Sequence, residues 1–155
     1  MHTEEKKLLY IEDNIADIKL FEEAISFNEL AINLEYVTDG QEMLNYFHAA
    51  KQAKYKDLPD LIITDLNLPK ISGQQVISVI KKDEVFKKIP IIVFTTSKLK
   101  SDIEKCYEYG ANAYLTKPVD IDHIFELVAL IDKFWLRHCM LIKNPFNAEA
   151  QVLQG

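Results

Sequence analysis

The chain has 155 residues, of which 48% are hydrophobic, enough for one domain with a substantial core. It carries 18 basic and 24 acidic residues, a net charge of −6, so we expect no nucleic-acid surface, which would need a basic patch. No apolar run approaches transmembrane length and no signal-peptide pattern follows Met1, so the expected location is the cytoplasm, without membrane contact.

Short apolar segments alternate along the chain with segments of helical periodicity. The apolar segments predict strands at roughly residues 7–12, 33–38, 60–65, 90–95 and 112–116. One helical pattern follows Asn14, a second runs from Asp39 to about Lys51, and a third starts near Gly73 and ends before Pro90. A fourth runs from Ser101 to Gly110, and a fifth starts near Val119. Such alternation predicts right-handed βαβ crossovers and therefore an α/β fold with a parallel sheet.

Reactive polar residues stand directly after four of the apolar runs. They are Glu12 and Asp13, Asp65, Thr95 and Thr96, and Lys117. The carboxyl ends of parallel strands meet at one edge of the sheet, where ligands bind in open α/β folds, so these side chains should converge. Asp17 and Lys19, by contrast, are predicted to be surface residues of the first helix.

A cluster of carboxylates needs a cation, because like charges repel each other and a divalent ion with oxygen ligands relieves that repulsion. We predict Mg2+, bound directly by Asp13 and Asp65 and directly or through water by Glu12. A backbone carbonyl near Asn67 would complete the protein ligands.

The same residues suit phosphoryl transfer. With its charge partly neutralised, Asp65 can attack phosphorus as a carboxylate nucleophile. Lys117 and the Thr95 hydroxyl would then contact the equatorial phosphoryl oxygens. Thr96 and Ser97 would either cap the next helix or tune the lifetime of the phosphoryl group, and the residues alone favour neither.

In their order and spacing, Glu12-Asp13, Asp65, Thr95 and Lys117-Pro118 resemble the motifs of the receiver domains of two-component response regulators, and the resemblance extends to about Trp135. It implies a flavodoxin-like, doubly wound (βα)5 fold with a five-stranded sheet of order 2-1-3-4-5. It also implies that a sensor histidine kinase phosphorylates Asp65.

The resemblance further implies roles for residues around the phosphoacceptor. Asn67 and Thr96 would contribute to phosphoryl binding, and the peptide bond before Pro118 would be cis. Tyr114 would be a switch aromatic, coupled to Thr95 and turning inward on phosphorylation, although the sequence alone equally allows an ordinary half-buried strand residue. Finer features, such as LNLPK after Asp65, resemble the small stand-alone regulators associated with bacteriophytochromes, which implies a phytochrome-like kinase.

We expect a receiver domain over residues 1–136 and an extension over 137–155, too short for a separate output domain. Several apolar residues lie at this end of the chain: Phe134, Trp135, Leu136, Met140, Leu141 and Ile142. One expectation is that they lie beyond the cover of the sheet and form a homodimer with the face made by the fourth helix, fifth strand and fifth helix, or bind another partner. The alternative is that they pack back on their own domain.

Other functions are weighed against this one. A haloacid-dehalogenase-like phosphatase needs a second aspartate as general acid where Asn67 stands, so we expect a self-phosphorylating regulator rather than a turnover enzyme. A flavodoxin-like cofactor carrier would place a flavin phosphate against the acidic, glycine-free EDNIAD segment, which would repel it. A pseudo-receiver that binds partners without phosphorylation stays open as an alternative, although none of the site residues is missing.

Overall fold

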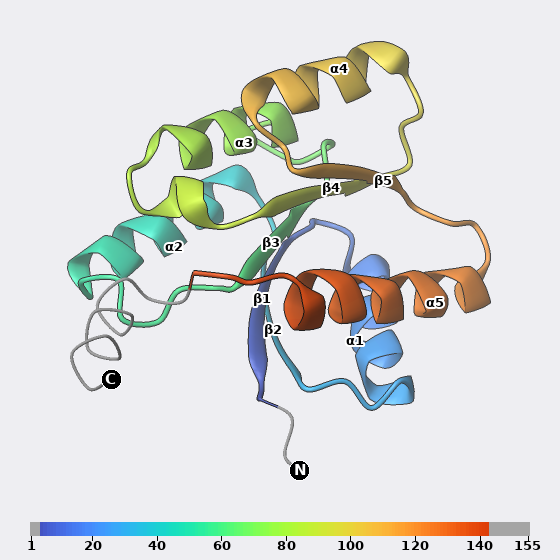
Figure 1. Ribbon diagram of the computed structural model, residues 1–155. Coiled ribbons are helices and arrows are strands. Elements are labelled where there is room, and N and C mark those ends of the chain that lie inside the picture. Colours follow the sequence, from blue (N-terminus) through green and yellow to red (C-terminus); the bar gives the residue numbers. More distant parts are fainter. Residues whose placement is uncertain (1–3, 143–155) are drawn as a thin grey trace.

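The structure, a computed structural model, describes residues 4–142 and contains a parallel sheet with helices on both faces (Figure 1). The strands are β1 (Lys6–Ile11), β2 (Ile32–Val37), β3 (Leu61–Thr64), β4 (Ile91–Thr95) and β5 (Ala113–Thr116). Their order is β2-β1-β3-β4-β5, and every pairing is parallel. The predicted doubly wound α/β fold and its strand order are confirmed.

Five α-helices within the described residues connect and cover the strands. They are α1 (Ile15–Phe27), α2 (Gly40–Gln52), α3 (Gly73–Lys82), α4 (Lys100–Tyr109) and α5 (Ile121–Ile131). Helices α1 and α5 lie on one face of the sheet, and α2, α3 and α4 lie on the other (Figure 1). Within residues 4–142, no helix is long and apolar enough to span a membrane.

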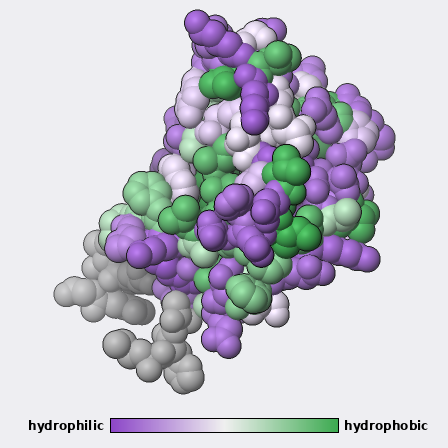
Figure 2. All heavy atoms as spheres, turned by 90° about the vertical axis from the view of Figure 1, so that its right-hand side faces the viewer, coloured by the Kyte–Doolittle hydropathy of each residue, from purple (hydrophilic) through white to green (hydrophobic). Residues whose placement is uncertain are grey.

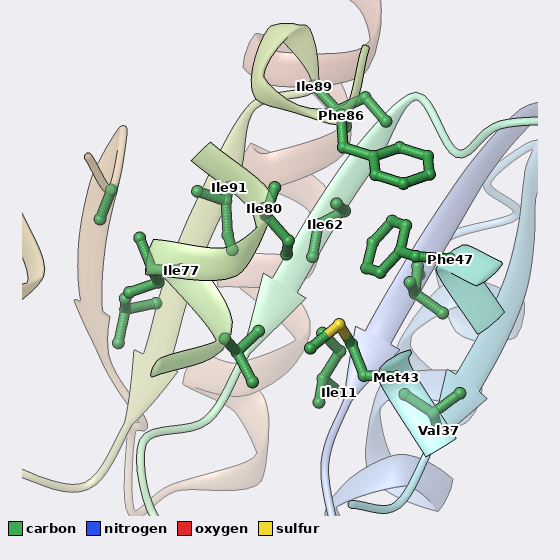
Figure 3. Packing of buried hydrophobic residues seen from close by; sticks show 14 of the residues in the cluster. Ile11, Val37, Met43, Phe47, Ile62, Ile77, Ile80, Phe86, Ile89 and Ile91 are labelled. Carbon is green, nitrogen blue, oxygen red and sulfur yellow. The ribbon is translucent and has the colours of Figure 1, made fainter. Parts of the chain in front are cut away.

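The core lies in two layers because the central strands are buried on both faces. In one layer, Met43 and Phe47 of α2 and Ile77 of α3 pack against strand residues such as Ile62 (Figure 3). In the other, residues of α1 and α5 pack against the opposite side of the same strands, and the tilted rings of Phe21 and Tyr10 lie with their centres 5.0 Å apart. This burial explains why the strands are continuous apolar runs in the sequence.

Side-chain caps define where the helices begin. Asn14, Asp39, Ser72 and Asp120 each accept a hydrogen bond from a backbone N–H of the helix that follows. At the other end of α4, Gly110 adopts a left-handed conformation with φ of 109°, as its predicted role as a helix stop requires.

Of two sequence expectations about local structure, one is confirmed and one is wrong. Helix α3 ends at Lys82, before Pro90 as expected, because the Asp83 carboxylate accepts hydrogen bonds from Val85 and Phe86 and turns the chain into η1, a short 3-10 segment (Phe86–Lys88). Every peptide bond within residues 4–142 is trans, including the one before Pro118 that the resemblance implied to be cis.

The end of the described chain folds back on its own domain. Helix α5 continues directly into η2, a π-helical segment (Asp132–His138). Leu136 is 2% exposed, and Trp135 and Leu141 pack against the α1–α5 side of the core. The expectation that these three side chains lie beyond the cover of the domain is therefore wrong, while Phe134 remains 56% exposed.

Candidate functional site

The sheet register brings the sequence-predicted residues to one edge. Ile11 of β1 pairs with Thr64 of β3, so the next residues, Glu12 and Asp65, leave the two strands side by side. The Asp65 N–H donates to the Ile11 carbonyl at 3.0 Å. Beyond β4, the Lys117 N–H donates to the carbonyl of Thr95 at 2.7 Å, which aligns the exit of β5 with that of β4. The carboxyl ends of β4 and β5 point to the right of Figure 1, and Figure 2 views that side.

Three acidic residues form one cluster at this edge. Carboxylate oxygens of Glu12, Asp13 and Asp65 all lie within 4.8 Å of one another. Glu12 and Asp65 are buried, whereas Asp13 is exposed. Closely spaced carboxylates with one open side suit a hard divalent cation, which takes oxygen ligands and keeps water on its free positions.

The Lys117 ammonium lies among three carboxylates. Its Nζ donates to Glu12 Oε2 at 2.8 Å, to Asp17 Oδ2 at 2.8 Å and to Asp65 Oδ2 at 2.9 Å. Burial opposes the charged form of this lysine, but the three carboxylates outweigh burial and raise its pKa. The lysine is therefore a fixed positive charge beside the candidate nucleophile.

The two buried carboxylates differ in their protonation. Burial is the main cause that raises the pKa of Glu12 to about 7, and the hydrogen bond from Lys117 only partly opposes it. Burial also disfavours ionised Asp65, but hydrogen bonds from Lys117 and Thr95 contribute to a net lowering of its pKa. Asp65 therefore stays ionised at neutral pH, as a carboxylate nucleophile must.

Backbone contacts fix the orientation of the Asp65 side chain. Its Oδ1 accepts from the N–H of Leu66 at 2.6 Å and from that of Asn67 at 3.4 Å, while Oδ2 faces Lys117. The loop also requires a glycine at position 73, where a Cβ would lie 2.6 Å from the Leu66 Cα. The local backbone thus holds one carboxylate oxygen and directs the other toward the site.

Ser97 links the end of β4 to the neighbouring elements. Its N–H donates to the Thr95 hydroxyl at 3.4 Å, and its own hydroxyl donates to Asp102 of α4 at 2.6 Å. The Tyr114 hydroxyl donates to the Ser97 carbonyl at 2.9 Å, and the Tyr114 ring packs against the core. Ser97 thus contributes to the start of α4, whereas Thr96 is exposed and its effect on phosphoryl lifetime stays a prediction.

Asp17 is the site residue that the sequence reasoning missed. The prediction that it is only a surface residue is wrong, because its carboxylate contacts Lys117 and its side chain is 29% exposed. Lys19 is exposed, as predicted. A signal was available: with Asn14 as N-cap, Asp17 falls in the first turn of α1, next to the edge where the strands end.

Comparison with known proteins identifies the family. Residues 8–129 match the family model described as the response regulator receiver domain. The chain belongs to this family. It is 34% identical over 131 residues to the response regulator Rcp1 of Synechocystis, a match that covers 84% of this chain and 89% of that protein.

Solved structures of receiver domains share the fold and are similar over most of their length. The crystal structure of the phosphorylated cyanobacterial phytochrome response regulator RcpA is 37% identical, with a TM-score of 0.81, over 89% of this chain and 99% of that one. The receiver domain of the sensor histidine kinase PA1611 from Pseudomonas aeruginosa, solved with magnesium in its active-site cleft, is 26% identical, with a TM-score of 0.61, over 82% and 97% of the two chains. The resemblance to receiver domains, including those associated with phytochromes, is confirmed.

Proposed function

We propose that this receiver domain accepts a phosphoryl group on Asp65 from a sensor histidine kinase, and that phosphorylation switches a protein-interaction surface. The observation that carries the proposal is the position of Asp65, which lies in a carboxylate cluster and 2.9 Å from the Lys117 ammonium. The relative RcpA, a phosphorylated cyanobacterial phytochrome response regulator, supports a phytochrome-like kinase as the donor.

The chemistry follows from the side chains. An Asp65 oxygen attacks the phosphorus of a phosphohistidine, an O–P bond forms, and the P–N bond breaks with its electron pair returning to the imidazole. Lys117 and the Thr95 hydroxyl would stabilise the charge on the transferring group, which is where positioned donors contribute most to phosphoryl transfer. Asn67 and Thr96, both exposed beside the site, would contact the bound phosphoryl group.

The donor set fits Mg2+. Glu12, Asp13 and Asp65 would hold it, together with the Asn67 backbone carbonyl. When bound, Mg2+ would neutralise carboxylate charge and bind phosphoryl oxygens. A role as turnover phosphatase is disfavoured, because the position two residues after Asp65 carries an asparagine, whose amide is not acidic enough to protonate a leaving group.

The rim of the site supports contact with a protein donor. Exposed apolar residues begin α1 and α5 or lie in the loops that precede α4 and α5: Ile15, Leu99, Val119 and Ile121. Figure 2 shows hydrophobic residues bordering hydrophilic ones on this side of the molecule.

The cytoplasmic location stays a prediction, as does the division into a receiver domain over 1–136 and an extension over 137–155.

The test is phosphorylation by the cognate kinase or acetyl phosphate with Mg2+, followed by intact mass. We expect one acid-labile phosphoryl group on the wild type and none on Asp65→Asn. Asp57→Asn is the matched control, because Asp57 is exposed and contacts Lys7 at the opposite edge of the sheet. Equal labelling of Asp65→Asn, or no labelling of the wild type, would contradict the proposal and favour a phosphorylation-independent module.

We also propose that the protein forms a homodimer through the outer side of α5. Leu130 is 60% exposed, and with Glu126 it separates two grooves, one toward α4 and β5 and one toward α1. In an antiparallel pair of α5 helices centred on Leu130, Glu126 of each copy would face Lys133 of the other. Phe134 would extend the apolar contact. Such self-complementary contacts suit closed twofold pairing.

Sedimentation measures this dimer. We expect the wild type to associate at tens of micromolar (an order-of-magnitude estimate) and Leu130→Asp with Phe134→Asp to be monomeric. Leu136 is unsuitable for such a test because its burial would make an aspartate unfold the domain. Met140→Asp is the control, since Met140 is 97% exposed beyond η2. A wild type that stays monomeric with and without beryllofluoride would contradict the dimer.

A further inference from the structure

The three carboxylates around Lys117 differ in their other commitments. Glu12 and Asp65 also belong to the cluster that would hold a metal ion, and Asp65 is the proposed phosphoacceptor. Asp17 lies on α1, outside that cluster, and contacts Lys117 at 2.8 Å. When metal and phosphoryl group bind, Asp17 is therefore the one of these three partners that has no competing role.

Packing alone does not fix the Lys117 side chain. A cavity of about 110 Å³ lies beside it, with walls that include the rings of Tyr10, Phe21 and Phe94. The Lys117 Nζ lies 5.9 Å from the centre of the Phe94 ring, so only weak contact is made in that direction. The ammonium thus has room to leave its position, and the hydrogen bonds to carboxylates hold it in place.

Asp17 is itself held on a well-anchored turn. The Asn14 side chain accepts from the N–H groups of Ala16 and Asp17, and the Asn14 N–H donates to Glu12 Oε1 at 3.1 Å. The first turn of α1 is therefore tied to the end of β1. Lys117 is only 9% exposed, so its pair with Asp17 is better shielded from water than an ordinary surface ion pair.

We propose that Asp17 is a positioning residue that keeps Lys117 directed at the phosphoryl group; this inference rests on Asp65 being the phosphoacceptor. One N–H of the ammonium stays on Asp17 throughout. The N–H that faces Asp65 Oδ2 shifts to a phosphoryl oxygen as the O–P bond forms. No proton is transferred, and the lysine keeps its charge.

The kinetic test measures phosphorylation by acetyl phosphate with Mg2+ over a range of donor concentrations. We expect Asp17→Ala to lower the maximal rate about tenfold, with little change in the half-saturating donor concentration, because misplacement of a charge-stabilising group acts on the transition state. Asp17→Asn keeps an acceptor oxygen without the charge and should fall between. Glu23→Ala, an exposed acid on the same helix, should match the wild type.

A second measurement needs no phosphodonor. In wild type, the Lys117 ammonium should give an NMR signal protected from solvent exchange. Asp17→Ala should broaden or remove this signal while the backbone amide signals persist. If the wild type is phosphorylated and Asp17→Ala matches it in rate and ammonium signal, the positioning role is overturned. If Glu23→Ala is slowed equally, it is likewise overturned. A wild type that accepts no phosphoryl group contradicts the proposed function instead.

Discussion

The Lys117 Nζ lies 2.9 Å from Asp65 Oδ2, although 52 residues separate them in the chain. The strand between them in the sheet, β4, makes this contact possible, because it pairs with β3 on one side and with β5 on the other. Charges of opposite sign are thus held at the ends of β3 and β5, on either side of β4. The same lysine contacts Glu12, so it competes with a metal ion for two carboxylates.

That competition predicts that Lys117→Ala has opposite effects on Mg2+ binding and on phosphorylation. Removing the ammonium should tighten Mg2+ binding by about tenfold, because a positive charge within a few ångströms of a cation site repels the ion. It should also slow phosphorylation of Asp65, because a charge-stabilising donor is lost. Calorimetry measures the affinity, with the exposed Lys133→Ala as control. Weaker Mg2+ binding by Lys117→Ala would show that the lysine supports the metal site instead.

Asp13→Ala should weaken Mg2+ binding by at least about tenfold, since it removes a direct carboxylate ligand from the cluster. Calorimetry is again the suitable method. Fluorescence of Trp135 is a poor reporter of metal binding, because Trp135 lies in η2, far from the carboxyl ends of the strands. Arg137 of η2 donates to the carbonyl of Ala31, at the amino-terminal end of β2. Asp57→Ala provides a control at this amino-terminal edge of the sheet. Unchanged affinity in Asp13→Ala would remove Asp13 from the metal ligands.

The sequence predicted the parts of this molecule that depend on strand periodicity. Each apolar run became a strand, and residues directly after a run, such as Asp65 and Lys117, came together because parallel strands end at one edge. Asp17 was missed because its role depends on which way one turn of α1 faces, and hydrophobic periodicity does not report contacts of a polar face.

Local contacts set helix ends that hydrophobic periodicity does not define. The sequence places the end of α3 only before Pro90, and the Asp83 side chain, which satisfies two backbone N–H groups, sets that end at Lys82. From the sequence alone, Leu136 is expected to be an exposed apolar residue beyond the last helix. It is buried because α5 continues as η2, in which Arg137 binds Asp132 five residues earlier, and a π-helical turn is not visible in a pattern of period 3.6.

Asp83 predicts a pH-dependent contribution to stability. Burial opposes its ionisation, but Lys51 at 2.8 Å and two backbone N–H groups outweigh burial and lower its pKa from 3.8. A carboxyl whose pKa is lower in the folded state contributes stability above its unfolded-state pKa and loses it as pH falls through the folded-state value. Asp83→Asn should therefore unfold about 1 kcal/mol more easily at pH 7.

The difference between Asp83→Asn and wild type should shrink as the pH falls from the unfolded-state pKa through the lower folded-state pKa of Asp83, below which both side chains are neutral. Chemical denaturation at several pH values measures it. Glu84→Gln is the matched control, because Glu84 is adjacent and its side chain is 87% exposed. A difference that stays constant until acid unfolds both proteins would show that the Asp83 charge is not its source.

Arg137 should stabilise the packing of η2 against the amino-terminal edge of the sheet. Its guanidinium donates to Asp132 at 3.1 Å and to the carbonyls of Glu4 and Ala31. Arg137→Ala should cost about 2–3 kcal/mol of unfolding free energy, because it leaves the buried Asp132 carboxylate without its cation. Lys105→Ala, at an exposed position on α4, should change stability little.

The double variant Asp132→Asn with Arg137→Ala should recover part of that loss, because a neutral amide tolerates burial better than an unpaired carboxylate. Thermal or urea unfolding of all four proteins completes a double-mutant cycle. If the double variant loses more unfolding free energy than the two single variants together, the Asp132 charge stabilises the fold through a partner other than Arg137.

Tyr114 gives the prediction that bears on signalling. The expectation that it turns inward on phosphorylation stays a prediction. In this structure the Tyr114 ring already packs on the core, and its hydroxyl donates to the Ser97 carbonyl. A phosphoryl group on Asp65 adds charge that should draw Thr95 and Lys117 toward it. Because Ser97 also contacts the Thr95 hydroxyl, this shift should strengthen the bond that holds Tyr114.

Tyr114→Phe should remove that bond while keeping the ring. We expect beryllofluoride to change the NMR signals of residues 97–115 in wild type, and to change them less in Tyr114→Phe, even though both proteins bind it. Tyr107→Phe is the control, since Tyr107 is half-exposed on the adjacent α4. Site signals near Asp65 report occupancy separately. Equal responses of residues 97–115 in wild type and Tyr114→Phe would mean that the Tyr114 hydroxyl does not couple the phosphoryl site to α4.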